Sequence, residues 1–193
     1  MFPREIEFYL KRAKTFAARV KGAIYPRTIE LNCEYAPSAE PVEFKDRLAL
    51  AYAPIRKGEI WGRDWSSAWF HVTGSVPEEF QGAELSLLMN IGGEALIFDA
   101  EGTPVYGLTG GTVYSSDYYK NNYPLKKAAP GTELDFWIEG AANSLFGLLH
   151  EEMREISFDH PRKSFTGTLI NCDLAVFDRE VWSLCLDLEV LIS

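Results

Sequence analysis

The feature that most constrains the fold is a strict alternation of side-chain character along residues 132–139, TELDFWIE. Alternate residues of an extended strand point to opposite faces of a sheet. The inward set is Leu134, Phe136 and Ile138, and the outward set is Glu133, Asp135, Trp137 and Glu139. A strand with one buried apolar face and one polar face in contact with solvent is typical of an antiparallel sheet.

The same period of two recurs in other short segments. In residues 28–35, TIELNCEY, the residues Ile29, Leu31, Cys33 and Tyr35 share one face, which predicts a single strand. Further strands are predicted over residues 68–76, 84–90, 94–99 and 103–107. The last two flank a turn at residues 100–102 that contains a glycine. Several short strands separated by Gly, Pro and Asn turns predict a mainly β protein with a β-sandwich.

Helical periodicity is confined to the two ends of the chain. Residues 3–21 carry apolar side chains at helical spacing, with a proline in the first turn and a glycine after the last residue. A second apolar stripe runs from about Cys172 to Leu191. These patterns predict an N-terminal amphipathic helix in residues 1–22, a β-sandwich domain in residues 23–170 and a C-terminal helix in residues 171–193. The final helix is expected to lead toward a further domain.

Charge and cysteine usage exclude several classes of protein. The 193-residue chain has a net charge of −9, which argues against binding to nucleic acid or to an anionic membrane. The N-terminus is charged and lacks the apolar segment of a signal peptide, and no run approaches the ~18 apolar residues of a membrane span. Three cysteines without a CxxC motif support neither a disulfide framework nor a zinc site. We therefore expect a soluble cytoplasmic protein with reduced thiols.

Carboxylates are numerous, but no motif singles out a catalytic pair. A glycosidase needs two carboxyl groups about 5–10 Å apart, and the conceivable members are Glu94, Asp99, Glu101 and Glu139. In a chain this acidic, we interpret them as solvated surface charges. His150 before Glu151 and Glu152 is the one local cluster of metal-ligand types, and we interpret it as a surface loop. No catalytic or metal-binding residue is predicted.

Aromatic side chains offer the candidates for binding. Trp61, Trp65 and Trp69 are spaced four apart, but glycines and Asp64 in the same window oppose a helix. Trp61 and Trp65 are therefore predicted in a loop that leads into a strand. The segment YSSDYYKNNY places four tyrosines among polar residues, as at a sugar site or a domain interface. The candidate carbohydrate or interdomain contacts are Trp61, Asp64, Trp65, Tyr118, Tyr119 and Trp137.

Four segments in a fixed order carry a resemblance to a known family. They are GEIWGRDWSSAWFHVTGSVP, GGEALIFDAEGTPVYGLT, FWIEGAANSLFG and CDLAVFDREVWSLCLDLEVL. Together they resemble the N-terminal region of class II α-mannosidases of glycoside hydrolase family 38, of the cytosolic and bacterial type. The resemblance covers nearly the whole chain. It implies a galactose-binding-like jelly-roll sandwich that precedes a catalytic barrel.

The resemblance also implies where the chemistry resides. The family's divalent metal, zinc or cobalt, and its nucleophile belong to the catalytic domain, and no residue of this chain matches those motifs. The chain is therefore expected to be a non-catalytic domain that is inactive alone, with the catalytic domain as its partner and the parent enzyme acting on α-mannosidic linkages. Mannose-containing oligosaccharides and a second copy of the chain are further expected partners. The alternative is a free-standing carbohydrate-binding module.

Overall fold

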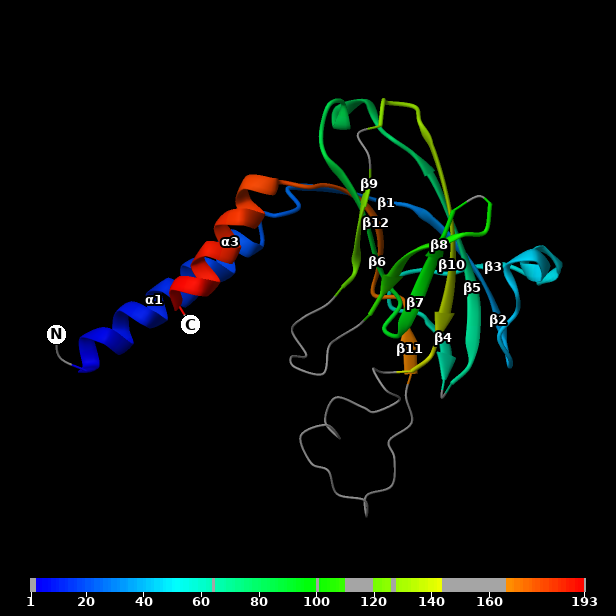
Figure 1. Cartoon of the computed structure of the whole chain (residues 1–193), viewed down its shortest axis with the longest axis horizontal. Coiled ribbons are helices and arrows are strands. Elements are labelled where there is room, and N and C mark those ends of the chain that lie inside the picture. The colour runs from blue at the N-terminus through cyan, green and yellow to red at the C-terminus, as the bar shows by residue number, and fades with distance from the viewer. Residues whose placement is uncertain are drawn as a thin grey trace, which may run out of the picture.

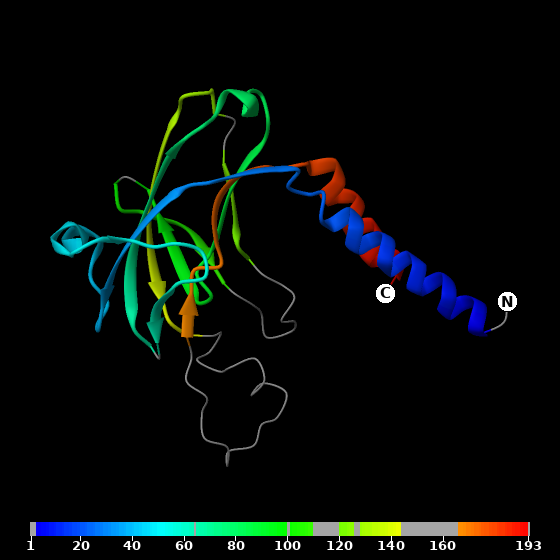
Figure 2. The same cartoon turned by 180° about the vertical axis from the view of Figure 1, so that it is seen from behind.

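A computed structural model describes residues 3–63, 65–99, 101–109, 120–125, 128–143 and 166–192. These residues form a β-sandwich from which two helices project together as an arm (Figure 1). The helices are α1 (Pro3–Lys21) and α3 (Arg179–Ile192). They lie side by side and run antiparallel in both views (Figures 1 and 2), and we call this pair the helical arm.

Two antiparallel sheets make up the sandwich. The four-stranded sheet has the order β1-β12-β6-β9, and the six-stranded sheet has the order β3-β2-β5-β10-β7-β8. The strands of the first are β1 (Arg27–Glu30), β12 (Asn171–Val176), β6 (Leu85–Asn90) and β9 (Asn122–Leu125). Those of the second are β2 (Asn32–Ser38), β3 (Ala53–Pro54), β5 (Ser67–Ser75), β7 (Glu94–Phe98), β8 (Pro104–Leu108) and β10 (Glu133–Ala141). A separate pair, β4 (Ile60–Arg63) and β11 (Thr166–Thr168), lies at one end.

The predicted mainly β sandwich with a helix at each end is confirmed. Helix α1 covers the predicted residues, and β7 and β8 form the predicted antiparallel pair. Strand β10 lies in the middle of the larger sheet, paired with β5 on one side and β7 on the other. The TELDFWIE segment therefore forms the centre of the six-stranded sheet.

The prediction of one strand over residues 28–35 is wrong. The chain forms β1 up to Glu30 and β2 from Asn32, and the two strands belong to different sheets. Leu31 between them is buried, and its amide donates a hydrogen bond to the carbonyl of Cys172 in β12. An uninterrupted alternation is compatible with such a crossover because both strands direct their apolar residues toward the same core.

The predicted helix over residues 171–193 is wrong in its first part. Residues 171–176 form β12, which pairs with β1 and β6, and the helix begins at Arg179. Cys172 and Leu174 in this strand continue the apolar stripe of the helix in sequence, and a short apolar segment does not by itself distinguish a strand from a helix. The helix start is marked by Asp178, whose carboxylate accepts a hydrogen bond from the Val181 amide at 3.0 Å, as an N-cap does.

The core fills the space between the two sheets. Its fully buried side chains come from the middle strands of both sheets and include Phe70, Val72, Leu87, Met89, Ile138 and Leu174. The outer face of the six-stranded sheet is also covered. A segment around the 3-10 helix η1 (Phe44–Ala49) lies against it, and the indole of Trp69 donates a hydrogen bond to the Val42 carbonyl at 2.8 Å. The larger sheet is thus packed on both faces.

Candidate functional site

Trp61 lies in the core and not in a loop as predicted. It belongs to β4, and its indole N–H donates a hydrogen bond of 2.6 Å to the carbonyl of Ile91. The ring meets Phe70 edge to face, with centroids 5.3 Å apart, and packs directly over Gly167. A buried indole with its donor satisfied inside the protein cannot stack on a sugar.

Trp65 is exposed in the turn between β4 and β5. Its side chain is 61% exposed, and its backbone takes a positive φ of 68°, which side chains other than glycine rarely adopt. The amide of Trp65 is fixed by a hydrogen bond of 2.9 Å to the carbonyl of Ala142. Asp64 lies outside the described residues. Trp65 is therefore the candidate contact residue that the described structure presents to solvent.

Trp137 was predicted to be exposed, and this prediction is wrong because the side chain is only 9% exposed. It lies on the outer face of the sheet, as the alternation indicates, but residues of the η1 segment cover it. The Arg47 guanidinium lies 4.4 Å from the indole centroid, and Tyr52 packs edge to face at 5.8 Å. Burial raises the pKa of the Tyr52 hydroxyl to about 12. The cluster attaches the covering segment to the sheet.

A histidine and a carboxylate meet beside this cluster. His71 Nε2 lies 3.0 Å from an oxygen of Asp135 on the neighbouring strand. Among the described residues, no hydroxyl or thiol is hydrogen-bonded to the other ring nitrogen of His71, where the nucleophile of a catalytic triad would lie. The ring of His71 instead lies against Trp137. The arrangement supports packing and not catalysis.

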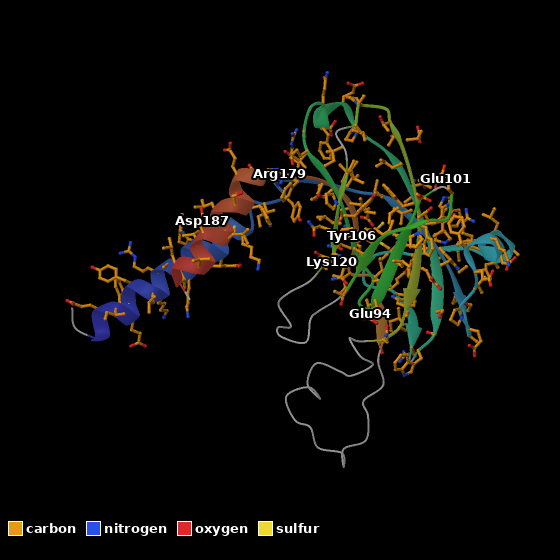
Figure 3. The ribbon with its side chains drawn as sticks, viewed as in Figure 1. Glu94, Glu101, Tyr106, Lys120, Arg179 and Asp187 are labelled. Carbon is orange, nitrogen blue, oxygen red and sulfur yellow. The ribbon has the colours of Figure 1, made fainter. Side chains whose placement is uncertain are left out.

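The four conceivable glycosidase carboxylates lie on strand β7, in the turn that follows it and on strand β10. Glu94 begins β7 and accepts a hydrogen bond of 2.7 Å from the Asn143 amide, whereas Glu101 lies in the turn beyond the other end of β7, as Figure 3 shows. Asp99 accepts hydrogen bonds from the amides of that turn. Glu139 lies on the outer face of β10, where burial raises the pKa of its carboxyl group. Glu94 and Glu139 are diagonal neighbours on the same face of the sheet, because Glu94 pairs with Ala141 and Glu139 pairs with Leu96.

The described residues contain no group of three or more His, Cys, Asp or Glu side chains that could hold a metal ion. The cluster of His150 with two glutamates lies outside the described residues. All three cysteines are free and buried. The pKa of the Cys172 thiol is raised mainly by a hydrogen bond with Cys33 and, to a lesser extent, by burial. A thiol with a raised pKa is unreactive because it forms little thiolate.

The tyrosine cluster falls mostly outside the described residues, including Tyr118 and Tyr119. Its last member, Tyr123 in β9, packs against Tyr106 of β8 with ring centroids 5.1 Å apart. The ammonium of Lys120 lies 4.1 Å from the centroid of the Tyr106 ring, and Figure 3 shows the two residues together at this edge of the sandwich. These contacts connect the edge strands of the two sheets.

The helical arm is the part of the described structure richest in exposed apolar side chains. Only Cys185 is buried in α3, and no side chain described in α1 is buried. The exposed apolar side chains of the arm are Ile6, Phe8, Tyr9, Leu10, Phe16, Trp182, Leu184, Leu186, Val190 and Leu191. A patch of this kind marks an interaction surface, because monomers seldom leave large apolar areas in water. Sequence reasoning found the α3 stripe and placed Phe16 in the apolar stripe of α1, but it did not find Phe8 and Tyr9.

Fold and surface define a class of protein: a β-sandwich that carries a helical arm with exposed apolar side chains. The family model described as "Alpha-mannosidase, jelly roll domain" matches residues 25–175. The chain belongs to this family, which confirms both the jelly-roll fold and the resemblance to α-mannosidases. None of the helices in the described residues is both long enough and apolar enough to cross a membrane.

Three curated relatives are similar over most of the chain. Alpha-mannosidase 2C1 of Mus musculus is 29% identical over 177 residues, which are 90% of this chain and 16% of that protein. Alpha-mannosidase 2C1 of Homo sapiens is 31% identical over 80% of this chain and 14% of that protein. Alpha-mannosidase G of Dictyostelium discoideum is 27% identical over 89% of this chain and 16% of that protein. The chain thus spans about one sixth of the length of the relatives it matches.

Proposed function

We propose that this chain is the non-catalytic N-terminal domain of a larger α-mannosidase and that its arm packs against the catalytic domain. The observation that carries the proposal is the match of an α-mannosidase jelly-roll family to most of a chain that spans about one sixth of its relatives. The parent enzyme would hydrolyse α-mannosidic linkages by a retaining mechanism with two carboxyl groups. The sandwich would support that enzyme structurally.

The divalent metal of the enzyme, zinc or cobalt, belongs in this proposal to the catalytic domain. Zinc and cobalt take several nitrogen, sulfur or oxygen ligands around one point. The donors of the described residues do not meet this requirement, because the thiols are buried in the core and the carboxylates are dispersed. A cytoplasmic location for the enzyme is supported by the three free cysteines.

The face of α3 that would meet the catalytic domain carries Trp182 and Leu186. These two side chains are one helical turn apart and are both exposed. Tryptophan at the centre of an interface contributes strongly to binding. Replacing both with serine in the proposed full-length enzyme should lower its unfolding temperature and its turnover. The same two substitutions should lower the unfolding temperature of the 193-residue chain by less.

Leu48 provides a matched control. It is an exposed leucine on η1, away from the arm. Leu48→Ser should leave both proteins unchanged. If the full-length enzyme tolerates Trp182→Ser with Leu186→Ser as well as it tolerates Leu48→Ser, the arm does not pack on the catalytic domain.

A second candidate function is carbohydrate binding by the sandwich itself. The observation that favours it is the exposed indole of Trp65, held at one end of the sandwich by a fixed backbone. Isothermal titration calorimetry with mannose and manno-oligosaccharides at millimolar concentration tests it. Heats that disappear in Trp65→Ala would support a binding module, and flat heats for the native chain would remove it.

A further inference from the structure

We propose that Cys33 and Cys172 form an oxidation site, at which hydrogen peroxide converts two facing thiols into a disulfide that joins the two sheets. This inference is independent of the function proposed above. The place of the two cysteines in the fold carries it, because they belong to different sheets and their side chains share one core. The third cysteine, Cys185, lies in α3 on the helical arm, apart from the sandwich (Figure 1).

The crossover at Leu31 brings the two cysteines together. Facing sheets usually lie about 10 Å apart, a gap that two short cysteine side chains do not span. Here β1 of the four-stranded sheet continues into β2 of the six-stranded sheet through Leu31 alone. The Leu31 amide donates a hydrogen bond of 3.0 Å to the Cys172 carbonyl, and Cys33 follows only two residues later. The sheets therefore converge at this point, and a hydrogen bond joins the two thiols.

A turn at the surface covers the thiol pair. It follows β3, and the Ile55 amide fixes its beginning with a hydrogen bond of 3.0 Å to the Cys33 carbonyl. The Lys57 ammonium donates a hydrogen bond of 2.5 Å to the Asp173 carboxylate, beside Cys172. The side chain of Lys57 is 35% exposed, and its charge acts on the Cys172 thiol. The pair thus lies just below a solvent-exposed group, and a local opening of the turn admits a molecule as small as hydrogen peroxide.

The oxidation balances with peroxide as its one co-reactant. Cys33 is 7% exposed and Cys172 is 1% exposed, so peroxide meets the Cys33 sulfur first. That sulfur attacks one peroxide oxygen, the O–O bond breaks, and Cys33 becomes a sulfenic acid while its thiol proton leaves in a water molecule. The Cys172 sulfur then attacks the sulfenic sulfur, the S–O bond breaks, and the hydroxyl leaves with the Cys172 proton as a second water. The two thiols lose two electrons, and peroxide is reduced to two waters.

Contact between the two thiols selects the disulfide as the product. Cys172 forms little thiolate, but it is held against the sulfur that it attacks, and such proximity replaces a high concentration of a free reactant. Further oxidation of Cys33 requires a second peroxide molecule to enter the core. Cys185 lies on the arm, whereas both other cysteines lie in the sandwich, so it has no thiol within reach.

The disulfide should stabilise the sandwich. It closes a loop of about 140 residues, and a closed loop of this size restricts the unfolded chain. The unfolding temperature of the oxidised chain should therefore be about 5–10 °C above that of the reduced chain. A reductant such as dithiothreitol should reverse the shift.

Peroxide treatment of the folded 193-residue chain tests the site. After incubation with millimolar hydrogen peroxide, one of the three thiols should remain, and the mass should fall by that of two hydrogen atoms. The reaction should be slow, because both thiols are buried. Peptide mapping without reductant should locate the new bond between Cys33 and Cys172. This measurement on the native chain requires no substitution in the core.

Alanine variants provide the controls. Cys185→Ala should form the same disulfide and retain no free thiol. Cys33→Ala and Cys172→Ala should form no disulfide within the chain, and circular dichroism shows whether they keep the fold.

Five results would each overturn the proposal. They are three thiols left in the native chain, addition of oxygen without loss of hydrogen, a disulfide that includes Cys185, a Cys33–Cys172 bond that forms only in urea, and an oxidised chain no more stable than the reduced one.

Discussion

The imidazole ring of His71 lies flat on the indole ring of Trp137, with ring centroids 4.0 Å apart and planes inclined by 6°. The two residues face each other on β5 and β10. Arg47 and Tyr52 close over the same indole. An aromatic side chain that could have bound a sugar is instead a packing centre on the outer face of the sheet.

Removing this centre should affect stability and not ligand binding. Trp137→Ala should lower the free energy of unfolding by about 3 kcal/mol, because it leaves His71, Arg47 and Tyr52 around a cavity. Urea unfolding measures the loss. Leu48→Ala on the same covering segment should cost less than about 0.5 kcal/mol, since Leu48 is exposed. Equal losses in the two variants would contradict the packing role of Trp137.

The contact between Trp61 and Gly167 should not tolerate a methyl group. A Cβ atom on Gly167 would lie 2.5 Å from the Trp61 ring. Gly167→Ala should therefore destabilise the fold by about 1–3 kcal/mol through overpacking. Gly107→Ala, in strand β8 with no neighbouring atom within 4 Å, is the matched control and should be nearly neutral. Thermal unfolding that gives the same midpoint for both variants would contradict the placement of Trp61.

Trp65 should be replaceable by glycine without loss of stability. The positive φ of 68° costs about 1 kcal/mol for a side chain that has a Cβ atom, and the exposed indole contributes little burial to offset it. Trp65→Gly should therefore unfold at an equal or higher temperature. A drop of several degrees in differential scanning calorimetry would show that the indole packs on part of the protein.

The raised pKa of the Glu139 carboxyl group should make the free energy of unfolding depend on pH. Burial raises the pKa of its carboxyl group in the folded chain, so the folded state binds its proton more tightly than the unfolded state does. This contribution to stability therefore decreases as pH rises through the interval between the unfolded and folded pKa values. Glu139→Gln should be more stable than the native chain at pH 7 and equal to it below pH ~4, where both side chains are neutral. A stability difference that does not change with pH would contradict this.

The sequence predicted correctly those elements whose signals lie within their own residues, such as α1 and β10. Helix α1 has its proline, its apolar spacing and its terminal glycine within its own sequence, and the face of each residue in β10 follows from its alternation. The outward face of Trp137 was predicted correctly, but its burial was not. Burial depends on residues 42–52, which lie about ninety positions away in a proline-containing stretch without periodicity.

The wrong predictions for β12 and Trp61 also arose because burial depends on residues that are distant in the sequence. Strand β12 is buried along most of its length, including the polar residue Asp173, and it lies between β1 and β6 in its sheet. A sequence window does not contain these neighbours. Trp61 looked like a loop residue because glycines surround it, yet Gly167 is a glycine that makes room for its ring.

The most direct test of the account is an assay of the 193-residue chain with an aryl α-mannoside and added zinc or cobalt. The function proposed above assigns the catalytic residues to a separate domain, so we predict no turnover above that of buffer. A longer protein in which the catalytic domain follows this chain should hydrolyse the same substrate and lose activity on chelation. Turnover by the 193-residue chain alone, abolished by a chelator and restored by metal, would contradict the account.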